Sequence, residues 1–357
     1  MKGLILTGGA GTRLRPLTHT GPKQLIPIAN KPNVLYCLED LRDAGVTDIG
    51  VILGDNQPEK VRELLMDGSE YGVEITYIDQ GSPKGIAHAV LCAETFTKEE
   101  PFCVYLGDNV LKGGIRAVLG DFLAGGPDAE VLLCAVPNPE KFGVAEIDKA
   151  GNILSLVEKP KEPKSNLALV GIYFLRKSIF PIIRGLKPSW RNELEITEAL
   201  DGLQKQGGKI KAHVVTGWWK DTGRPEDILE ANRLVLDDFE RRIEGRIEDG
   251  ARVEGRVQAG KGTVIKAGSV VRGPTIIGQD CVIGPNTYIG PYTSIGDGSH
   301  LVEADIEASI VVGDCVIEGT DKIVNSLIGR HSAIRSRGDQ LPRGHQFFLG
   351  ENSTLIL

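Results

Sequence analysis

Short apolar runs alternate with segments of helical apolar spacing over the first 110 residues. The apolar runs predict strands, and they lie at 4–6, 48–54, 73–78 and 102–106. The intervening segments predict helices at 34–41, 58–66 and 86–96, and Gly45 is placed to end the first of them. This alternation predicts a mainly parallel sheet with helices on both faces. Ligands of such sheets bind beyond the carboxyl ends of the strands, so the residues that follow each strand are candidates for a site.

The pattern changes to a mixed α+β region between residues 129 and 217. Further strands are predicted at 131–136, 144–147, 153–157, 167–174 and 210–215. Pro225 then opens an amphipathic helix that we expect to run to about Arg242. The charged end of this helix is the predicted boundary between two domains.

A six-residue repeat follows, in which an apolar residue recurs without a break. Its members are Ile247, Val253, Ala259, Ile265, Val271, Ile277, Ile283, Ile289, Ile295 and Leu301. A small residue usually stands four positions later, and this pattern resembles the left-handed parallel β-helix of hexapeptide-repeat proteins. After Leu301 the period slips between five and six, and we expect looser coils built on Val312, Ile317, Ile323, Ile328 and Ile334. Residues 340–357 are expected to cap the solenoid.

The predicted fold class is therefore α/β with two domains. A Rossmann-like, mixed-sheet domain would span residues 1–242, and the β-helix with its tail would span 243–357. A chain of 357 residues is long enough for two such domains. Because solenoids of stacked coils often associate, we also expect a homo-oligomer.

Composition limits the cellular compartment and the classes of binding partner that we expect. No apolar run is long enough to span a bilayer, and the first residues lack the features of a signal peptide. The six cysteines form no C-x-x-C pair, which indicates neither a zinc site nor a disulfide scaffold and fits the cytoplasm. The net charge of −7 argues against binding a nucleic-acid backbone, although a local basic pocket for one nucleotide remains open.

A glycine-rich turn follows the first predicted strand. It holds Gly8, Gly9 and Gly11, with Arg13 just after it and Lys23 ten residues further on. Successive N–H groups in such a turn can cradle an anion, and both cations can donate hydrogen bonds to phosphate oxygens. The turn lacks the glycine spacing of a dinucleotide fingerprint and the final Gly-Lys-Ser/Thr of a P-loop. It therefore predicts a phosphate site of another kind.

The run GGAGTRLRPLT followed by PKQLIPI resembles the signature of the sugar-1-phosphate nucleotidyltransferases. The resemblance covers about residues 1–240. Among the branches of the family, KQL and the run Arg191-Asn192-Glu193-Leu194-Glu195-Ile196-Thr197 resemble the thymidylyltransferases, with Asn192 in place of the glycine of RGELEIT. The resemblance implies that dTTP and glucose 1-phosphate react to give dTDP-glucose and pyrophosphate. In that reaction the sugar phosphate attacks the α-phosphorus in line, so the protein would position reactants and neutralise charge with Mg²⁺ as cofactor.

The resemblance also implies roles for individual residues. It makes Arg13, Lys23, Asp108 and Lys159 catalytic, and Asp108 and Asp221 the ligands of Mg²⁺. Nucleotide binding falls to Leu6, Gly8, Gly9, Gly11, Thr12, Arg13, Gln24, Gln80, Pro83, Gly85 and Asp108. Sugar-phosphate binding falls to Asn109, Gly143, Glu158, Lys159, Val170, Gly171 and Trp219.

Two other functions remain open at this point. The first is a uridylyltransferase acting on glucose or N-acetylglucosamine 1-phosphate, with acetyl transfer on the β-helix by His300, His331 or His345. The second is a nucleotide-sugar sensor that has kept the fold without the chemistry. Both carboxylates of the expected metal site argue against the sensor, because binding alone has little need of them.

Overall fold

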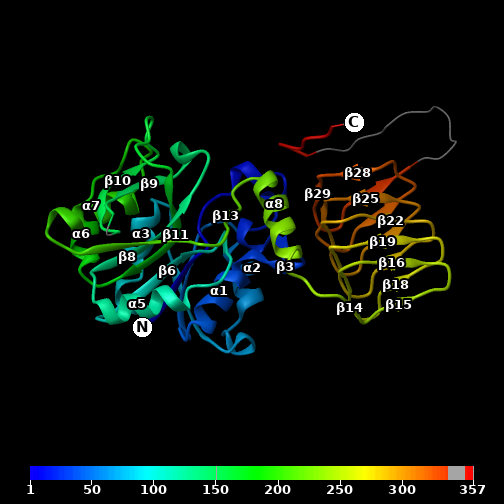
Figure 1. Cartoon of the computed structure of the whole chain (residues 1–357), viewed down its shortest axis with the longest axis horizontal. Helices are drawn as coiled ribbons and strands as arrows, with labels where there is room; N and C mark the ends of the chain where they lie inside the picture. The colour runs from blue at the N-terminus through cyan, green and yellow to red at the C-terminus, as the bar shows by residue number, and fades with distance from the viewer. Residues whose placement is uncertain (150, 337–349, 357) are drawn as a thin grey trace. The chain divides into compact units, whose positions relative to one another are not determined.

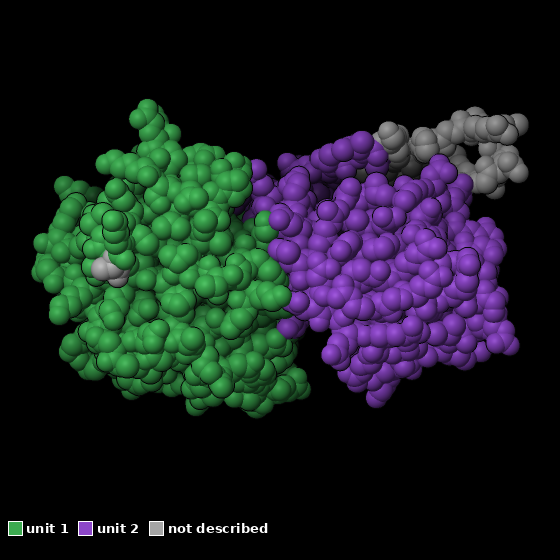
Figure 2. Space-filling model, in the orientation of Figure 1, with its two compact units in different colours: residues 1–11, 20–25, 33–221 green, residues 12–19, 26–32, 222–357 purple. Residues whose placement is uncertain are grey.

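The computed structural model describes residues 1–149, 151–336 and 350–356. The chain forms two compact units, coloured separately in Figure 2. Unit 1 consists of Met1–Gly11, Thr20–Leu25 and Asn33–Asp221. Unit 2 consists of Thr12–His19, Ile26–Pro32 and Thr222–Leu357, so two short N-terminal segments belong to it. The expected division of the chain at residue 242 stays a prediction.

Unit 1 is built on a nine-stranded mixed sheet (Figure 1). Its strands are β1 (Lys2–Leu6), β4 (Asp48–Leu53), β5 (Glu74–Asp79), β6 (Phe102–Leu106), β8 (Ala129–Ala135), β9 (Gly143–Ile147), β10 (Ile153–Glu158), β11 (Leu167–Leu175) and β12 (Ile210–Val214). The order is β10-β9-β11-β6-β1-β4-β5, with β8 also beside β11 and β12 beside β8. Strands β6, β1, β4 and β5 are parallel, whereas β11 runs antiparallel to β6. The parallel first half and the mixed second half are both as expected.

Helices cover both faces of this sheet, and each face has its own apolar core. The helices are α1 (Asn33–Asp43), α2 (Pro58–Leu65), α3 (Ile86–Cys92), α4 (Glu94–Thr97), α5 (Arg116–Gly125), α6 (Ile179–Gly185) and α7 (Ile196–Lys205). Helices α3, α6 and α7 supply apolar side chains to one core, and α1, α2 and α5 to the other. The helix expected at 86–96 is interrupted, because the Ala93 N–H turns back to the Val90 carbonyl and separates α3 from α4.

A two-stranded ribbon joins distant parts of unit 1. Strand β7 (Asn109–Leu111) pairs antiparallel with β13 (Trp219–Asp221). The register sets Asp221 opposite Asn109, and Asp108, two residues beyond the end of β6, directly precedes Asn109 in the chain. Long-range pairing thus brings the two expected metal ligands into one region.

The solenoid of unit 2 has three parallel sheets, stacked coil upon coil in Figure 1. One sheet holds β14 (Arg242–Ile243), β17 (Val257–Ala259), β20 (Thr275–Ile277), β23 (Thr293–Ile295), β26 (Ile310–Val311) and β29 (Leu327–Ile328). The second holds β15 (Arg246–Ile247), β18 (Val264–Ile265), β21 (Val282–Ile283), β24 (His300–Val302), β27 (Val316–Glu318) and β30 (Ala333–Arg335). The third holds β16 (Arg252–Glu254), β19 (Val270–Arg272), β22 (Tyr288–Ile289), β25 (Asp305–Glu307) and β28 (Ile323–Val324).

The six-residue period matches this solenoid closely. Each coil takes eighteen residues, as the pairing of Val257 with Thr275 shows, and contributes one strand to every sheet. The repeat residues from Ala259 to Leu301 are buried in the core of the solenoid. The hexapeptide β-helix is therefore confirmed, and its handedness stays a prediction.

Two expectations at the ends of the solenoid are wrong. The helix α8 (Pro225–Leu236) ends before Arg242, because Arg242 and Ile243 already pair with the next coil. Val311, not Val312, occupies the buried inward position in register with Ile328. Coils beyond Leu301 are shorter, and this moves the inward position back by one residue. The expected cap at 340–357 falls largely outside the described residues, as does His345, whereas His300 and His331 are exposed.

Asn232 of α8 explains why the segment Ile26–Pro32 belongs to unit 2. This side chain is completely buried. Its Oδ1 accepts hydrogen bonds from the Ala29 N–H at 2.8 Å and the Ser294 hydroxyl at 2.7 Å. Its Nδ2 donates to the Tyr292 carbonyl at 3.1 Å. One amide therefore fastens the N-terminal segment, with its strands β2 (Pro27–Ile28) and β3 (Lys31–Pro32), and α8 to the solenoid.

Across the described ranges, none of the helices combines the length and the apolar character needed to cross a membrane.

Candidate active site

A pocket of about 420 Å³ opens in unit 1 beyond the carboxyl ends of β1 and β6. The expected site residues that line it are Leu6, Gly8, Gly9, Lys23, Gln24, Gln80, Pro83, Gly85, Asp108, Asn109, Gly143, Glu158, Lys159, Gly171, Trp219 and Asp221. Gly11 and Val170 do not line it, and Val170 is buried in the core below α1 and α5. Thr12 and Arg13 are exposed residues of unit 2.

Lys23 and Asp108 form a partly buried ion pair in this pocket. Asp108 is only 6% exposed, and its carboxylate contacts the Lys23 ammonium. Burial raises the pKa of Asp108, but the charge and hydrogen bond of Lys23 outweigh it and hold that pKa below its ordinary value. Asn109 adds a hydrogen bond of 3.0 Å from its Nδ2 to Asp108 Oδ1. Asp108 is therefore a charged carboxylate at neutral pH.

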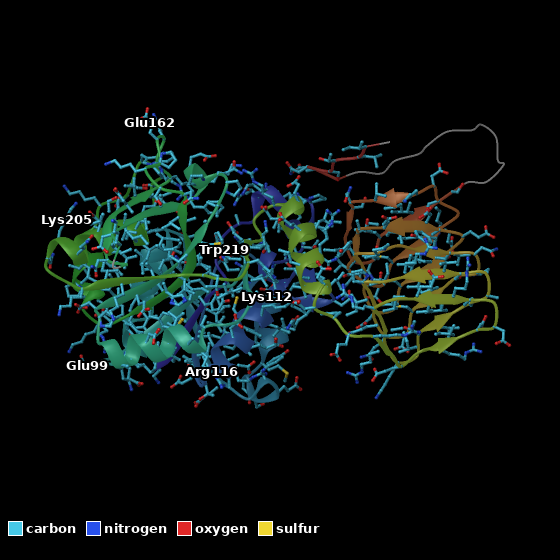
Figure 3. All side chains as sticks on the ribbon, viewed as in Figure 1. Glu99, Lys112, Arg116, Glu162, Lys205 and Trp219 are labelled. Atoms are coloured by element: carbon cyan, nitrogen blue, oxygen red, sulfur yellow. The ribbon has the colours of Figure 1, made fainter. Side chains whose placement is uncertain are left out.

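Trp219 holds Asn109 in place. Its indole N–H donates to Asn109 Oδ1 at 2.6 Å, and its ring packs edge-on against Phe142 with centroids 5.4 Å apart. Trp219 is labelled in Figure 3. Because the acceptor of Asn109 is taken, its Nδ2 points to Asp108. The polar groups of two residues expected to contact sugar thus support the carboxylate beside Lys23.

Asp108 and Asp221 fit a magnesium ion. Both carboxylates line the pocket, and carboxylate oxygens are the hard ligands that Mg²⁺ prefers. The ammonium of Lys23 beside Asp108 shows that this carboxylate attracts a cation. The described residues contain no cluster of three or more candidate ligands, and Mg²⁺ is commonly held by one or two carboxylates together with substrate phosphates.

The lining of the pocket also includes a network of acids around Arg191. Its guanidinium lies 3.4 Å from Glu158 Oε1, 3.3 Å from Glu195 Oε1 and 3.0 Å from Glu193 Oε1. Burial first and the neighbouring Glu195 second raise the pKa of Glu158. Lys159 Nζ stands 3.6 Å from Glu158 Oε1. Sequence reasoning used the Arg191 motif only to compare branches of a family, and the pocket role of Arg191 was missed.

Asn192 follows Arg191 in the left-handed backbone region, with φ of 60°. Glycine adopts this conformation without cost, and asparagine tolerates it better than most residues. The departure from RGELEIT therefore preserves the turn that presents Arg191.

The glycine-rich side of the pocket carries two glutamines. Gln24 is 1% exposed; its Nε2 donates to the Gly8 carbonyl at 3.2 Å, and its Oε1 is buried with no partner among the described residues. Gln80 is 8% exposed and contacts both Gly85 and His88. His88 was missed from the sequence, where its place in the helical pattern was the only signal.

Comparison with known proteins agrees with this geometry. The family model described as nucleotidyl transferase matches residues 2–238, and a model of bacterial transferase hexapeptide repeats matches residues 274–303. The chain belongs to the nucleotidyl transferase family. Within the family it is 51% identical to a low-salt glycan biosynthesis nucleotidyltransferase of Haloferax volcanii, over the whole of both chains. It is 46% identical to a glucose-1-phosphate thymidylyltransferase of Streptomyces antibioticus, over 99% of this chain and 98% of the relative.

A solved structure of the same nucleotidyl transferase family extends the likeness to three dimensions. It is a Bacillus anthracis protein assigned as a glucose-1-phosphate thymidylyltransferase and determined with sucrose. The two share 39% identity and a TM-score of 0.62, over 66% of this chain and 94% of the other. The expected combination of a nucleotidyltransferase domain and a hexapeptide β-helix is confirmed.

Proposed function

We propose that this chain makes dTDP-glucose and pyrophosphate from dTTP and α-D-glucose 1-phosphate. The observation that carries the proposal is the partly buried Lys23–Asp108 pair in one pocket with Asp221, Glu158 and Lys159. Such a pocket combines a metal site, cations for phosphate groups and an acid for sugar hydroxyls. The full-length likeness to a named thymidylyltransferase supports the choice of dTTP and glucose 1-phosphate.

Asp108 and Asp221 would hold Mg²⁺, which when bound supplies positive charge beside the reacting phosphates. Lys23 would contact the nucleotide phosphates, and Lys159 would hold the phosphate of the sugar so that its oxygen faces the α-phosphorus. Glu158, anchored by Arg191 at 3.4 Å, would accept hydrogen bonds from sugar hydroxyls. The N–H groups of the glycine-rich turn at Gly8 and Gly9 would face the phosphates. This arrangement lowers the barrier by positioning and charge neutralisation, without a protein nucleophile.

Thr12 and Arg13 keep their proposed roles at the triphosphate, and Gly11 keeps its proposed role in nucleotide binding. Val170 is fully buried and does not line the pocket, so we no longer assign it a contact with the sugar. A homo-oligomer and a cytoplasmic setting likewise remain proposals that fit the family.

The deciding experiment measures pyrophosphate release from a matrix of substrates. dTTP, UTP, GTP, CTP and ATP are each paired with glucose, galactose, mannose and N-acetylglucosamine 1-phosphates in the presence of Mg²⁺. We expect dTTP with glucose 1-phosphate to give the highest kcat/KM. A preference for UTP with N-acetylglucosamine 1-phosphate would favour the uridylyltransferase, and acetyl transfer by the β-helix would then be measured. Nucleotide binding without turnover of any pair would favour a sensor.

A further inference from the structure

The chemistry of its neighbours sets the orientation of the Gln80 amide. The Gly85 carbonyl oxygen lies 3.3 Å from the amide nitrogen, Nε2. A carbonyl oxygen can only accept a hydrogen bond, so this long contact favours the nitrogen over the oxygen of Gln80 at that position, but one contact of this length does not by itself lock the amide. One of the two amide protons of Gln80 is therefore donated to the Gly85 carbonyl.

The second amide proton is directed at His88. Nδ1 of His88 lies 3.3 Å from the same Nε2, and it can accept a proton only as the unprotonated nitrogen of a neutral ring. The ring proton then resides on Nε2, which faces Cys92 Sγ at 3.9 Å one turn along α3. Burial and the nearby charge of Lys84 both lower the pKa of His88, which favours the neutral ring. His88 and Gly85 together prevent the amide from turning over.

The amide oxygen of Gln80 consequently lies beside Gly8, one of the residues that line the pocket. A Cβ on Gly8 would stand 2.8 Å from this oxygen, so the oxygen lies directly over the glycine-rich turn. Only a residue without a side chain leaves that space open. Gln80, Gly8 and Gly85 all line the pocket, and the oxygen presents an acceptor to a ligand there.

We propose that His88 is a positioning residue for base selection. By fixing the Gln80 amide it presents Oε1 as an acceptor for the N3–H of thymine or uracil. Cytosine has an acceptor at N3, so its lone pair would face the oxygen and neither group would gain a hydrogen bond. This inference rests on the proposed function, because it places the base of a pyrimidine nucleotide beside Gln80.

The test compares His88→Leu, which removes the acceptor, with His88→Asn, whose Oδ1 can replace Nδ1. The assay measures kcat/KM for dTTP and for dCTP with glucose 1-phosphate. In His88→Leu the contact of 3.3 Å with Gly85 is the one remaining contact that orients the amide, so the turned-over form becomes accessible. We expect the dTTP to dCTP ratio to fall about tenfold in this variant, the equivalent of one hydrogen bond. His88→Asn should stay within about threefold of the parent ratio. Neither variant should change the KM for glucose 1-phosphate, which a general structural defect would raise.

Three results would overturn the inference, and one of them would overturn the proposed function as well. A parent protein that prefers dTTP to dCTP, with the same ratio in His88→Leu, removes the role of His88 and leaves the proposed function intact. A parent protein that prefers a purine nucleotide removes both. Should His88→Leu fail to fold, His88→Ala gives the same comparison without a bulky side chain. A ratio that falls equally in His88→Asn would also contradict the inference, because that variant keeps the acceptor.

Discussion

Both units of the molecule bury polar side chains, but of different kinds. The core of the solenoid holds small hydroxyls such as Thr263 and Thr287, which donate to backbone carbonyls of a neighbouring coil. Unit 1 instead buries the carboxylate of Asp108 and the amides of Gln24 and Gln80 around an open pocket. A buried hydroxyl that donates to a backbone carbonyl is already satisfied within the protein, so it does not indicate a ligand site. A buried charge beside open volume is costly unless it is paired, and it is the better mark of a site.

The largest effect that this comparison predicts is on activity, in Asp108→Asn. The variant keeps the shape of the side chain and removes its charge, so Mg²⁺ loses a ligand and Lys23 loses its partner. We expect kcat to fall by about three orders of magnitude or more. Pyrophosphate release at saturating Mg²⁺ measures the loss, and thermal melting verifies the fold.

Asp297→Asn in the solenoid is the matched control. Asp297 Oδ1 accepts from the Gln279 N–H at 2.7 Å, which an asparagine oxygen can also do. Activity and melting temperature should both stay close to those of the parent. Near-normal turnover by Asp108→Asn would remove Asp108 from the metal site.

Thr263→Val should have the opposite effect to Asp108→Asn: it lowers the stability of the fold and leaves the catalytic activity unchanged. The Thr263 hydroxyl donates to the Gly278 carbonyl at 2.7 Å and accepts from the Cys281 N–H at 3.0 Å. Valine would leave that buried N–H without a partner, at a cost of about 2 kcal/mol. A fall in melting temperature of about 5 °C should follow, with kcat unchanged at 25 °C. Thr263→Ser keeps the hydroxyl and should recover most of the loss; equal losses in both variants would assign the effect to packing.

Trp219→Phe tests whether the buried indole N–H of Trp219 supports activity by orienting Asn109 toward Asp108. Phenylalanine retains packing on Phe142 but cannot donate to Asn109 Oδ1, so Asn109 would no longer be held toward Asp108. We expect kcat to fall about tenfold, the equivalent of one hydrogen bond, with little change in the KM for glucose 1-phosphate. Steady-state kinetics separates the two quantities. An effect confined to that KM would instead support the expected role of Trp219 as a direct sugar contact.

The contrast between the units also explains what the sequence could predict. The inward residues from Ala259 to Leu301 were found because a strict six-residue period is a local property of the chain. The period failed at Val312, where the coil shortens and the neighbouring Val311 takes the inward position. A change of coil length depends on how turns fit against the preceding coil, and no single residue signals it.

In unit 1, Asp108 was predictable because it lies two residues beyond a buried strand, at the sheet edge where ligands bind. The support of Asn109 by Trp219 was not, because it depends on pairing between β7 and β13, which are far apart in sequence. The role of His88 could not be predicted for a similar reason. Its spacing identifies a helix, whereas its contact with Gln80 requires the packing of α3 against the end of β5.

The smallest effect concerns the pH dependence of stability, in Glu158→Gln. Burial and Glu195 raise the pKa of Glu158 above its ordinary value of 4.5, so the folded chain holds this proton more tightly than the unfolded chain. Folded stability must then decline as pH rises above about 4.5, until the folded carboxyl has ionised. Glutamine cannot ionise, so Glu158→Gln removes the loss of folding stability that comes from ionising this buried carboxyl. The variant should match the parent in melting temperature near pH 4 and exceed it by about 2 °C at pH 8.

An exposed acid in the solenoid, Glu318, provides a control for the expected rise in melting temperature of Glu158→Gln, because that rise depends on burial of the carboxyl. Glu318 forms an ion pair with Arg335 at 3.0 Å, but its side chain is 46% exposed. Exposed pairs contribute little, so Glu318→Gln should change the melting temperature by less than about 1 °C at pH 8. If Glu158→Gln is more stable at pH 8 yet has a raised KM for glucose 1-phosphate, the carboxylate is retained for binding at the expense of stability. A lower melting temperature for Glu158→Gln at pH 8 would mean that its attraction to Arg191 outweighs burial, and the pocket acids would then resemble structural ion pairs.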